Sequence, residues 1–178
     1  MVVKHRQKTK NGCGSLSIAN IFDDHRFTVG LEKLKGERIN DLNRKLLEMG
    51  SELFIDTLFL THKELKAGNR LKLAHEVLFK FPKKNVTKLI KEKYAVPYLL
   101  TIANSRGRNG HMVAALHSIS DGLFHIIDST KAEIKVMSYG DMIVDFHIVC
   151  VSLFREIDNE DLANFIMMPK PELPHIFE

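Results

Sequence analysis

The spacing of apolar residues divides this chain into a helical first part and a strand-rich second part. In the first part apolar positions recur every three or four residues, which predicts helices with one buried face. Asn11 and Gly12 are suited to the start of a helix, and Gly50 to the end of one. The interval 51–66 has the apolar content of either a buried strand or a helix, and we favour a helix. The predicted helices therefore cover 13–22, 37–49, 51–66, 70–80 and 86–94.

From Pro97 onward the pattern becomes that of strands separated by polar turns. Ser120-Asp121-Gly122 lies between two apolar runs and is a strong hairpin signal. We expect an irregular tail from about residue 156, where prolines gather near the end of the chain. A block of helices followed by a block of strands favours an α+β fold, with the helical part packed on a C-terminal antiparallel sheet. The predicted strands cover 97–103, 111–119, 123–128, 133–137 and 146–154.

Composition narrows the class of protein. The 178 residues are 44% apolar and 27% charged, which suits one globular domain over 1–178. No apolar run reaches the ~20 residues of a membrane span, and the first residues lack the apolar core of a secretion signal. We therefore expect a cytoplasmic protein, or one exported without a classical signal peptide. Glycine motifs for dinucleotides or P-loop phosphates are missing, and neither the two cysteines nor the histidines have metal-ligand spacing, so no cofactor is expected.

The net charge of +4 is unevenly distributed. Basic residues gather in 1–13 and 80–93, and acidic residues gather in 156–178. These stretches are either ordinary solvated surface or a basic face that attracts an acidic partner. The basic stretches lack interleaved aromatic residues and the chain has no tryptophan, so no nucleic-acid partner is expected.

Candidate chemistry converges on Gln7, Cys13, His111 and Asp128. Cys13 begins a predicted helix, where the helix dipole and free backbone N–H groups favour a thiolate nucleophile. His111 begins a predicted strand after a polar loop, and Asp128 ends the next strand, where a carboxylate orients an imidazole. The Gln7 side-chain amide precedes Cys13 closely enough to join its backbone N–H in binding an oxyanion. Cys150, within an apolar strand, is expected to be a core thiol.

The hairpin turn bears on whether this site assembles. A two-residue loop at Asp121-Gly122 pairs His111 with Ala132, which places His111 ~13 Å along the strand from Asp128. A longer loop or a bulge brings the two side chains together. We therefore expect an irregularity near 117–122.

These motifs make the chain similar to the papain-like cysteine peptidases, and within them to the peptidase C39-like group. The resemblance covers about 7–24 and 94–154, and it departs from the family pattern at Asn11-Gly12, where an acidic residue is usual, and at Ser129, where proline is usual. It implies a papain-like fold in which Cys13 is the nucleophile, His111 the general acid–base, Asp128 its orienter and Gln7 the oxyanion donor. The similar segments are Gln7, Asn11–Ala19, Tyr94–Leu99, Gly110–Leu116, Leu123–Asp128 and Ser138–Met142.

The resulting expectation is a thiol peptidase that cleaves a peptide or isopeptide amide through an acyl-thioester on Cys13. One alternative keeps the triad but makes the protein a glutamine deamidase, as in some bacterial effectors of C39-like fold, or an acyl transferase. Another alternative is a catalytically silent basic binding module. The expected partner is a peptide or protein substrate. Basic residues beside Cys13 and His111 in the sequence form either a substrate-binding rim for acidic peptides or ordinary loop charge: Lys8, Lys10, Arg106 and Arg108.

Overall fold

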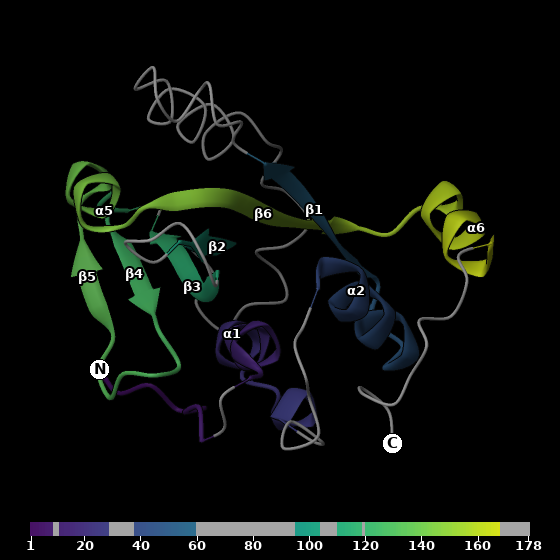
Figure 1. Ribbon diagram of the computed structural model, residues 1–178, viewed down its shortest axis with the longest axis horizontal. Helices are drawn as coiled ribbons and strands as arrows, with labels where there is room; N and C mark the ends of the chain where they lie inside the picture. Colours follow the sequence, from purple (N-terminus) through teal and green to yellow (C-terminus); the bar gives the residue numbers. More distant parts are fainter. Residues whose placement is uncertain (9–10, 29–37, 60–94, 104–109, 119, 168–178) are drawn as a thin grey trace.

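The structure is a computed structural model that describes residues 1–8, 11–28, 38–59, 95–103, 110–118 and 120–167. Within these residues the fold is mixed α+β, with one six-stranded antiparallel sheet in the order β1-β6-β2-β3-β4-β5 and four α-helices (Figure 1). The strands are β1 (Leu53–Phe59), β2 (Ala95–Ile102), β3 (His111–Ser118), β4 (Phe124–Ile127), β5 (Lys135–Met137) and β6 (Ile148–Glu156). The helices are α1 (Cys13–Phe22), α2 (Ile39–Glu48), α5 (Tyr139–Asp145) and α6 (Asn159–Met167), with a short 3₁₀ helix, η1 (His25–Thr28).

Two hydrophobic cores lie on the two faces of the sheet. Alternate residues of β3 contribute to each core: Met112 and Ala114 face one, and Val113 and Ala115 face the other. The first core also contains apolar residues of α1 and α2, and the second contains Met142 of α5. In Figure 1, α1 and α2 lie beneath the sheet, and α5 lies beside the end of β5. The central strands β2, β3 and β6 are therefore covered on both faces, which accounts for their mostly apolar residues.

The helix boundaries expected at Cys13 and near Gly50 agree with the start of α1 and the end of α2. α2 closes with two backbone bonds, from Gly50 N–H to Leu47 O and from Ser51 N–H to Leu46 O, both at 3.0 Å. This is the Schellman pattern, which needs a residue with positive φ, and Gly50 has φ of 75°. The chain then turns directly into β1.

The helix predicted over 51–66 is wrong for its described part. Leu53–Phe59 is strand β1, which pairs antiparallel with β6 along its whole length. Asn43 of α2 strengthens this arrangement, because its side chain accepts a hydrogen bond from Ile55 N–H at 2.7 Å and donates one to Ile55 O at 3.1 Å. The apolar run is compatible with a helix or a strand, and pairing with β6 makes it a strand. Residues 60–66, like the helices predicted over 70–80 and 86–94, lie outside the described residues.

The expectation of an irregular tail from about 156 is also wrong for residues 159–167, which form α6. Arg155 of β6 attaches this helix to the sheet, donating to Asp161 at 2.5 and 2.7 Å and also to Asp56 of β1. Its guanidinium lies over the Phe54 ring, 4.5 Å from the centroid. The contacts of Arg155 with β1 and α6 thus hold in place a helix that the apolar pattern of its own sequence did not predict. Residues 168–178 lie outside the described residues.

The hairpin between β3 and β4 has the longer loop that the site requires. Pairing ends at His117 with Phe124, and Ser118 N–H still donates to Leu123 O at 2.9 Å. Gly122, at φ of 71°, turns the chain. The register pairs Ala114 with Ile127, whereas a two-residue loop at Asp121-Gly122 would pair Ala114 with Ser129. If this register continues by one pair, Asp128 lies opposite Val113, which is two residues from His111. The irregularity expected near 117–122 is therefore confirmed as a longer loop.

Candidate active site

The N-terminal segment delivers Gln7 to the end of β4. Residues 1–7 run antiparallel to 129–134, with a bridge between Val2 and Glu133. Backbone bonds join Val3 N–H to Ala132 O at 2.9 Å and Gln7 N–H to Ser129 O at 2.7 Å. A residue far from β4 in sequence is thereby placed beside the dipeptide Asp128-Ser129.

Cys13 is the first residue of α1 and is partly exposed. The preceding Gly12 has φ of 104°, a backbone conformation that glycine adopts without strain. The first turn of α1 is held to β3 at Met112, whose N–H donates to Cys13 Sγ at 3.4 Å. One turn further along, Ser17 Oγ donates to Met112 O at 3.3 Å. Two residues of α1 therefore bind the two peptide groups of the residue that follows His111.

Gly14 allows this close approach of α1. A β-carbon at this position would lie 2.9 Å from Leu42 Cδ1 of α2 and 3.1 Å from Met112 Sδ of β3. Both distances are shorter than ordinary contacts between carbon or sulfur atoms. A larger residue after the cysteine would therefore require Leu42 or Met112 to shift.

His111 and Asp128 form a direct pair, with His111 Nε2 2.8 Å from Asp128 Oδ1. The two side chains are 28% and 18% exposed, so the pair is only partly screened by water. Asp128 Oδ1 also accepts hydrogen bonds from Thr130 N–H at 2.9 Å and Thr130 Oγ1 at 2.7 Å. These bonds close a tight turn that holds the Asp128 carboxylate in position to bind the imidazole.

This arrangement favours the charged forms of both groups. Hydrogen bonds first to Asp128 and then to the Cys13 thiol raise the pKa of His111 to about 9, against the effect of burial. Burial raises the pKa of Asp128, but hydrogen bonds from His111 and Thr130 outweigh it and lower that pKa to about 2. At neutral pH the pair is an imidazolium and a carboxylate. Because Nε2 bonds Asp128, Nδ1 is the ring nitrogen that remains for Cys13.

Gln7 and Ser129 are hydrogen-bonded to each other next to Asp128. Ser129 is fully buried, and its Oγ donates to Gln7 Oε1 at 3.1 Å. Sequence reasoning missed the roles of Ser129 and Thr130 around Asp128. The composition Asp-Ser-Thr directly after a strand was a usable signal, because short hydroxyl side chains close Asx-type turns. The structure therefore brings Cys13, His111 and Asp128 together, and it binds Gln7 to Ser129, the residue that follows Asp128.

The basic rim residues, His117 and Cys150 lie outside this site or outside the described residues. Of the four basic rim residues, Lys8 is exposed, while Lys10, Arg106 and Arg108 lie outside the described residues. His117 is buried and stacks on Phe124, with ring centroids 4.3 Å apart, so it belongs to a core. Both cysteines are free thiols; Cys150 is buried in β6, and burial raises its pKa.

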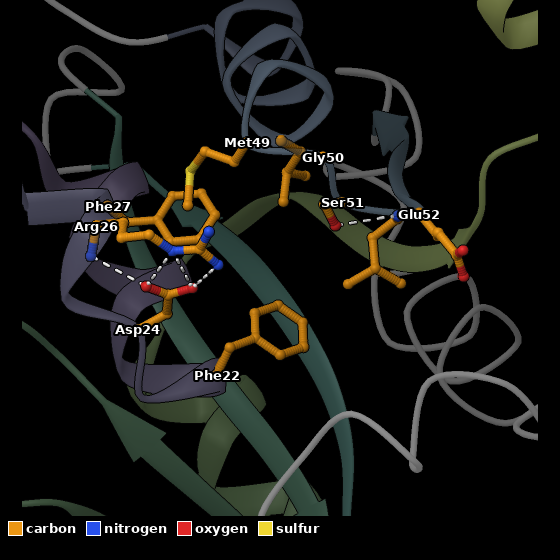
Figure 2. Close-up of a pocket in the computed structure, with 10 residues that line it drawn as sticks. Phe22, Asp24, Arg26, Phe27, Met49, Gly50, Ser51 and Glu52 are labelled. Carbon is orange, nitrogen blue, oxygen red and sulfur yellow. Dashed lines mark hydrogen bonds and ion pairs between the residues drawn. The ribbon is translucent and has the colours of Figure 1, made fainter.

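A separate pocket of about 390 Å³ lies at the opposite end of α1. Figure 2 shows the rings of Phe22 and Phe27 and the Met49 side chain around it, with Asp24 binding Arg26 on one wall. The rise of a helix puts about 14 Å between Cys13 and this end of α1. The pocket is thus not part of the Cys13 cluster.

No protein-family model matches this chain, and no curated protein matches it in sequence. The family resemblance of the motifs therefore stays a prediction. Among the described residues, no helix has the length and apolar character needed to cross a membrane.

Proposed function

We propose that this protein is a cysteine-dependent hydrolase of papain-like fold, related to the peptidase C39-like group, which cleaves a peptide or isopeptide amide. The observation that carries the proposal is the chain of contacts from Asp128 through His111 to Cys13. A nucleophile, a base and an orienting carboxylate in hydrogen-bond series are the pattern of covalent acyl transfer. The start of α1 at Cys13, packed on an antiparallel sheet, supports the papain-like assignment.

In the first half-reaction, the Cys13 thiolate attacks the carbonyl carbon of the scissile amide and the carbonyl oxygen becomes an oxyanion. The His111 imidazolium then donates its proton to the amide nitrogen. The C–N bond breaks, the amine leaves, and the acyl group remains on Cys13 as a thioester. The raised pKa of His111 keeps this proton available at neutral pH.

In the second half-reaction, neutral His111 takes a proton from a water molecule, and the hydroxide attacks the thioester. The C–S bond breaks, which releases a carboxylic acid and restores the thiolate beside the imidazolium. In both half-reactions the Cys13 backbone N–H and the Gln7 amide are proposed to bind the oxyanion. Such donors stabilise charge that develops only in the transition state.

The first test is selective labelling of Cys13. An excess of iodoacetamide near pH 7, followed by peptide mapping, should modify Cys13 well before Cys150. The His111→Gln variant should lose this selectivity, because glutamine cannot accept the proton of the Cys13 thiol. Cys150→Ser is the matched control and should label like the wild type. Equal inertness of both cysteines in the folded wild type contradicts the proposal and favours a catalytically silent binding module.

The second test identifies the reaction. Peptide libraries and ubiquitin-like conjugates are incubated with the wild type and with Cys13→Ala, and the products are followed by mass spectrometry. New termini that depend on Cys13 support hydrolysis of a peptide or isopeptide bond. Release of ammonia from glutamine side chains without chain cleavage indicates a deamidase, and products joined to an added amine indicate an acyl transferase. Turnover that persists in Cys13→Ala rules out the mechanism.

A further inference from the structure

We infer that Ser129 is a positioning residue that fixes the orientation of the Gln7 amide in the proposed oxyanion site. The inference rests on the proposed function. It also gives a role to Ser129, which stands where the papain-like peptidases that the chain resembles usually have proline. Ser129 itself touches neither the nucleophile nor the base in any described contact; its effect is transmitted through Gln7.

The chemistry of an amide side chain makes its orientation important. One branch, Oε1, only accepts hydrogen bonds, and the other branch, Nε2, only donates them. An oxyanion requires the donor, so a Gln7 side chain rotated by half a turn would place an oxygen against the developing negative charge. Ser129 Oγ donates to Oε1 at 3.1 Å, which assigns the oxygen branch to Ser129 and directs the NH₂ branch away from it.

Burial strengthens the hydrogen bond between Ser129 and Gln7. Ser129 has no exposed surface, so water does not compete effectively for its hydroxyl. Gln7 is bound to the same residue a second time, because its backbone N–H donates to Ser129 O at 2.7 Å. One bond thus fixes the main chain of Gln7 beside Ser129, and the other holds the oxygen of its side-chain amide.

The same turn also fixes the carboxylate of the triad. Asp128 precedes Ser129 directly, and Thr130 and Lys131 close the turn through bonds to Asp128 Oδ1 and Asp128 O. One short segment therefore orients His111 through Asp128 and Gln7 through Ser129. A proline at position 129 could supply neither the hydroxyl contact nor any substitute donor.

The test compares Ser129→Ala, Gln7→Ala and the double variant in a double-mutant cycle, with Ser129→Thr as the conservative control. Loss of a whole oxyanion donor costs ~10²–10³ in rate, so loss of its orientation should lower kcat by about 10-fold to 100-fold. KM should change little. Binding of a peptide aldehyde, whose adduct on Cys13 carries a tetrahedral oxygen, should weaken in parallel. The double variant should be no slower than Gln7→Ala alone, and Ser129→Thr should retain most of the activity.

Alkylation of Cys13 by iodoacetamide separates positioning from a general structural defect. This reaction needs the thiolate and His111 but builds no oxyanion, so Ser129→Ala should react at the wild-type rate. Additive losses in the double variant, or slower alkylation of a folded Ser129→Ala, overturn the positioning role while leaving the hydrolase proposal intact. A wild type that neither turns over substrate nor forms the aldehyde adduct overturns both.

Discussion

Replacing Asp128 by asparagine should lower the pKa of His111 markedly. The substitution keeps the size of the side chain and removes its charge. The fall of the Asp128 pKa from 3.8 to about 2 corresponds to about 2 kcal/mol, at ~1.4 kcal/mol per pH unit. This net fall combines the lowering by the His111 and Thr130 contacts with the raising by burial, so it gives the order of magnitude of the His111 contact. We therefore expect the His111 pKa to drop from about 9 by ~1–2 in Asp128→Asn.

The measurement is an NMR titration of protein labelled with ¹³C-histidine, from pH 5 to pH 10. The His111 signal is identified by its disappearance in His111→Gln. Asp121→Asn removes an exposed carboxylate in the β3–β4 loop and is the matched control; it should leave the His111 midpoint unchanged. A midpoint in Asp128→Asn within ~0.5 of the wild-type value would refute the reasoning, since the charge at Asp128 would then contribute little to the imidazolium.

The pH dependence of stability gives an independent check with a defined sign. The pKa of His111 is higher in the folded state, so its contribution is complete below about pH 6.5 and is lost as the pH rises through about 9. The pKa of Asp128 is lower in the folded state, so its contribution is complete above 3.8 and is lost as the pH falls through about 2. The difference in unfolding free energy between the wild type and Asp128→Asn should thus be largest between about pH 4 and 6.5. A difference that grows toward pH 9 contradicts this account.

Three further predictions concern the fold, and one concerns the substrate. Gly14→Ala should destabilise the protein by ~1–3 kcal/mol in urea unfolding, because its β-carbon would lie 2.9 Å from Leu42 Cδ1; unchanged stability would mean that α1 can shift freely. Asn43→Leu should cost ~1–3 kcal/mol by leaving the β1 backbone without its partners, whereas no loss would show that water replaces them. Arg155→Met should speed hydrogen exchange in α6 and leave α1 unchanged, and equal exchange in α6 would contradict the attachment of that helix. If the basic rim steers acidic substrates, salt should lower kcat/KM with kcat nearly unchanged, and replacing the rim residues by serine should abolish this dependence: Lys8, Lys10, Arg106 and Arg108.

The proximity of Cys13, His111 and Asp128 could be predicted from sequence because each of the three has a local signature. Cys13 follows Asn11-Gly12 at the start of a helical apolar pattern, and His111 and Asp128 stand at the ends of two apolar runs. A residue at the end of a strand or the start of a helix lies where the regular element meets a loop, and this can be predicted from local pattern alone. The need for a longer hairpin loop was also predictable, since strand geometry alone sets how far His111 lies from Asp128.

Contacts between distant segments account for what local signatures leave open. Residues 53–59 are a strand because β6 lies beside them, and α6 is attached to the sheet through Arg155. The supporting roles of Ser129 and Thr130 depend on the N-terminal segment and on the turn after β4, which meet only in the folded chain. A hydrogen bond or a strand pairing between residues far apart in sequence leaves no periodic pattern in either one. Local pattern therefore predicts which residues belong to the candidate site, and the packing of distant segments sets how their side chains are oriented.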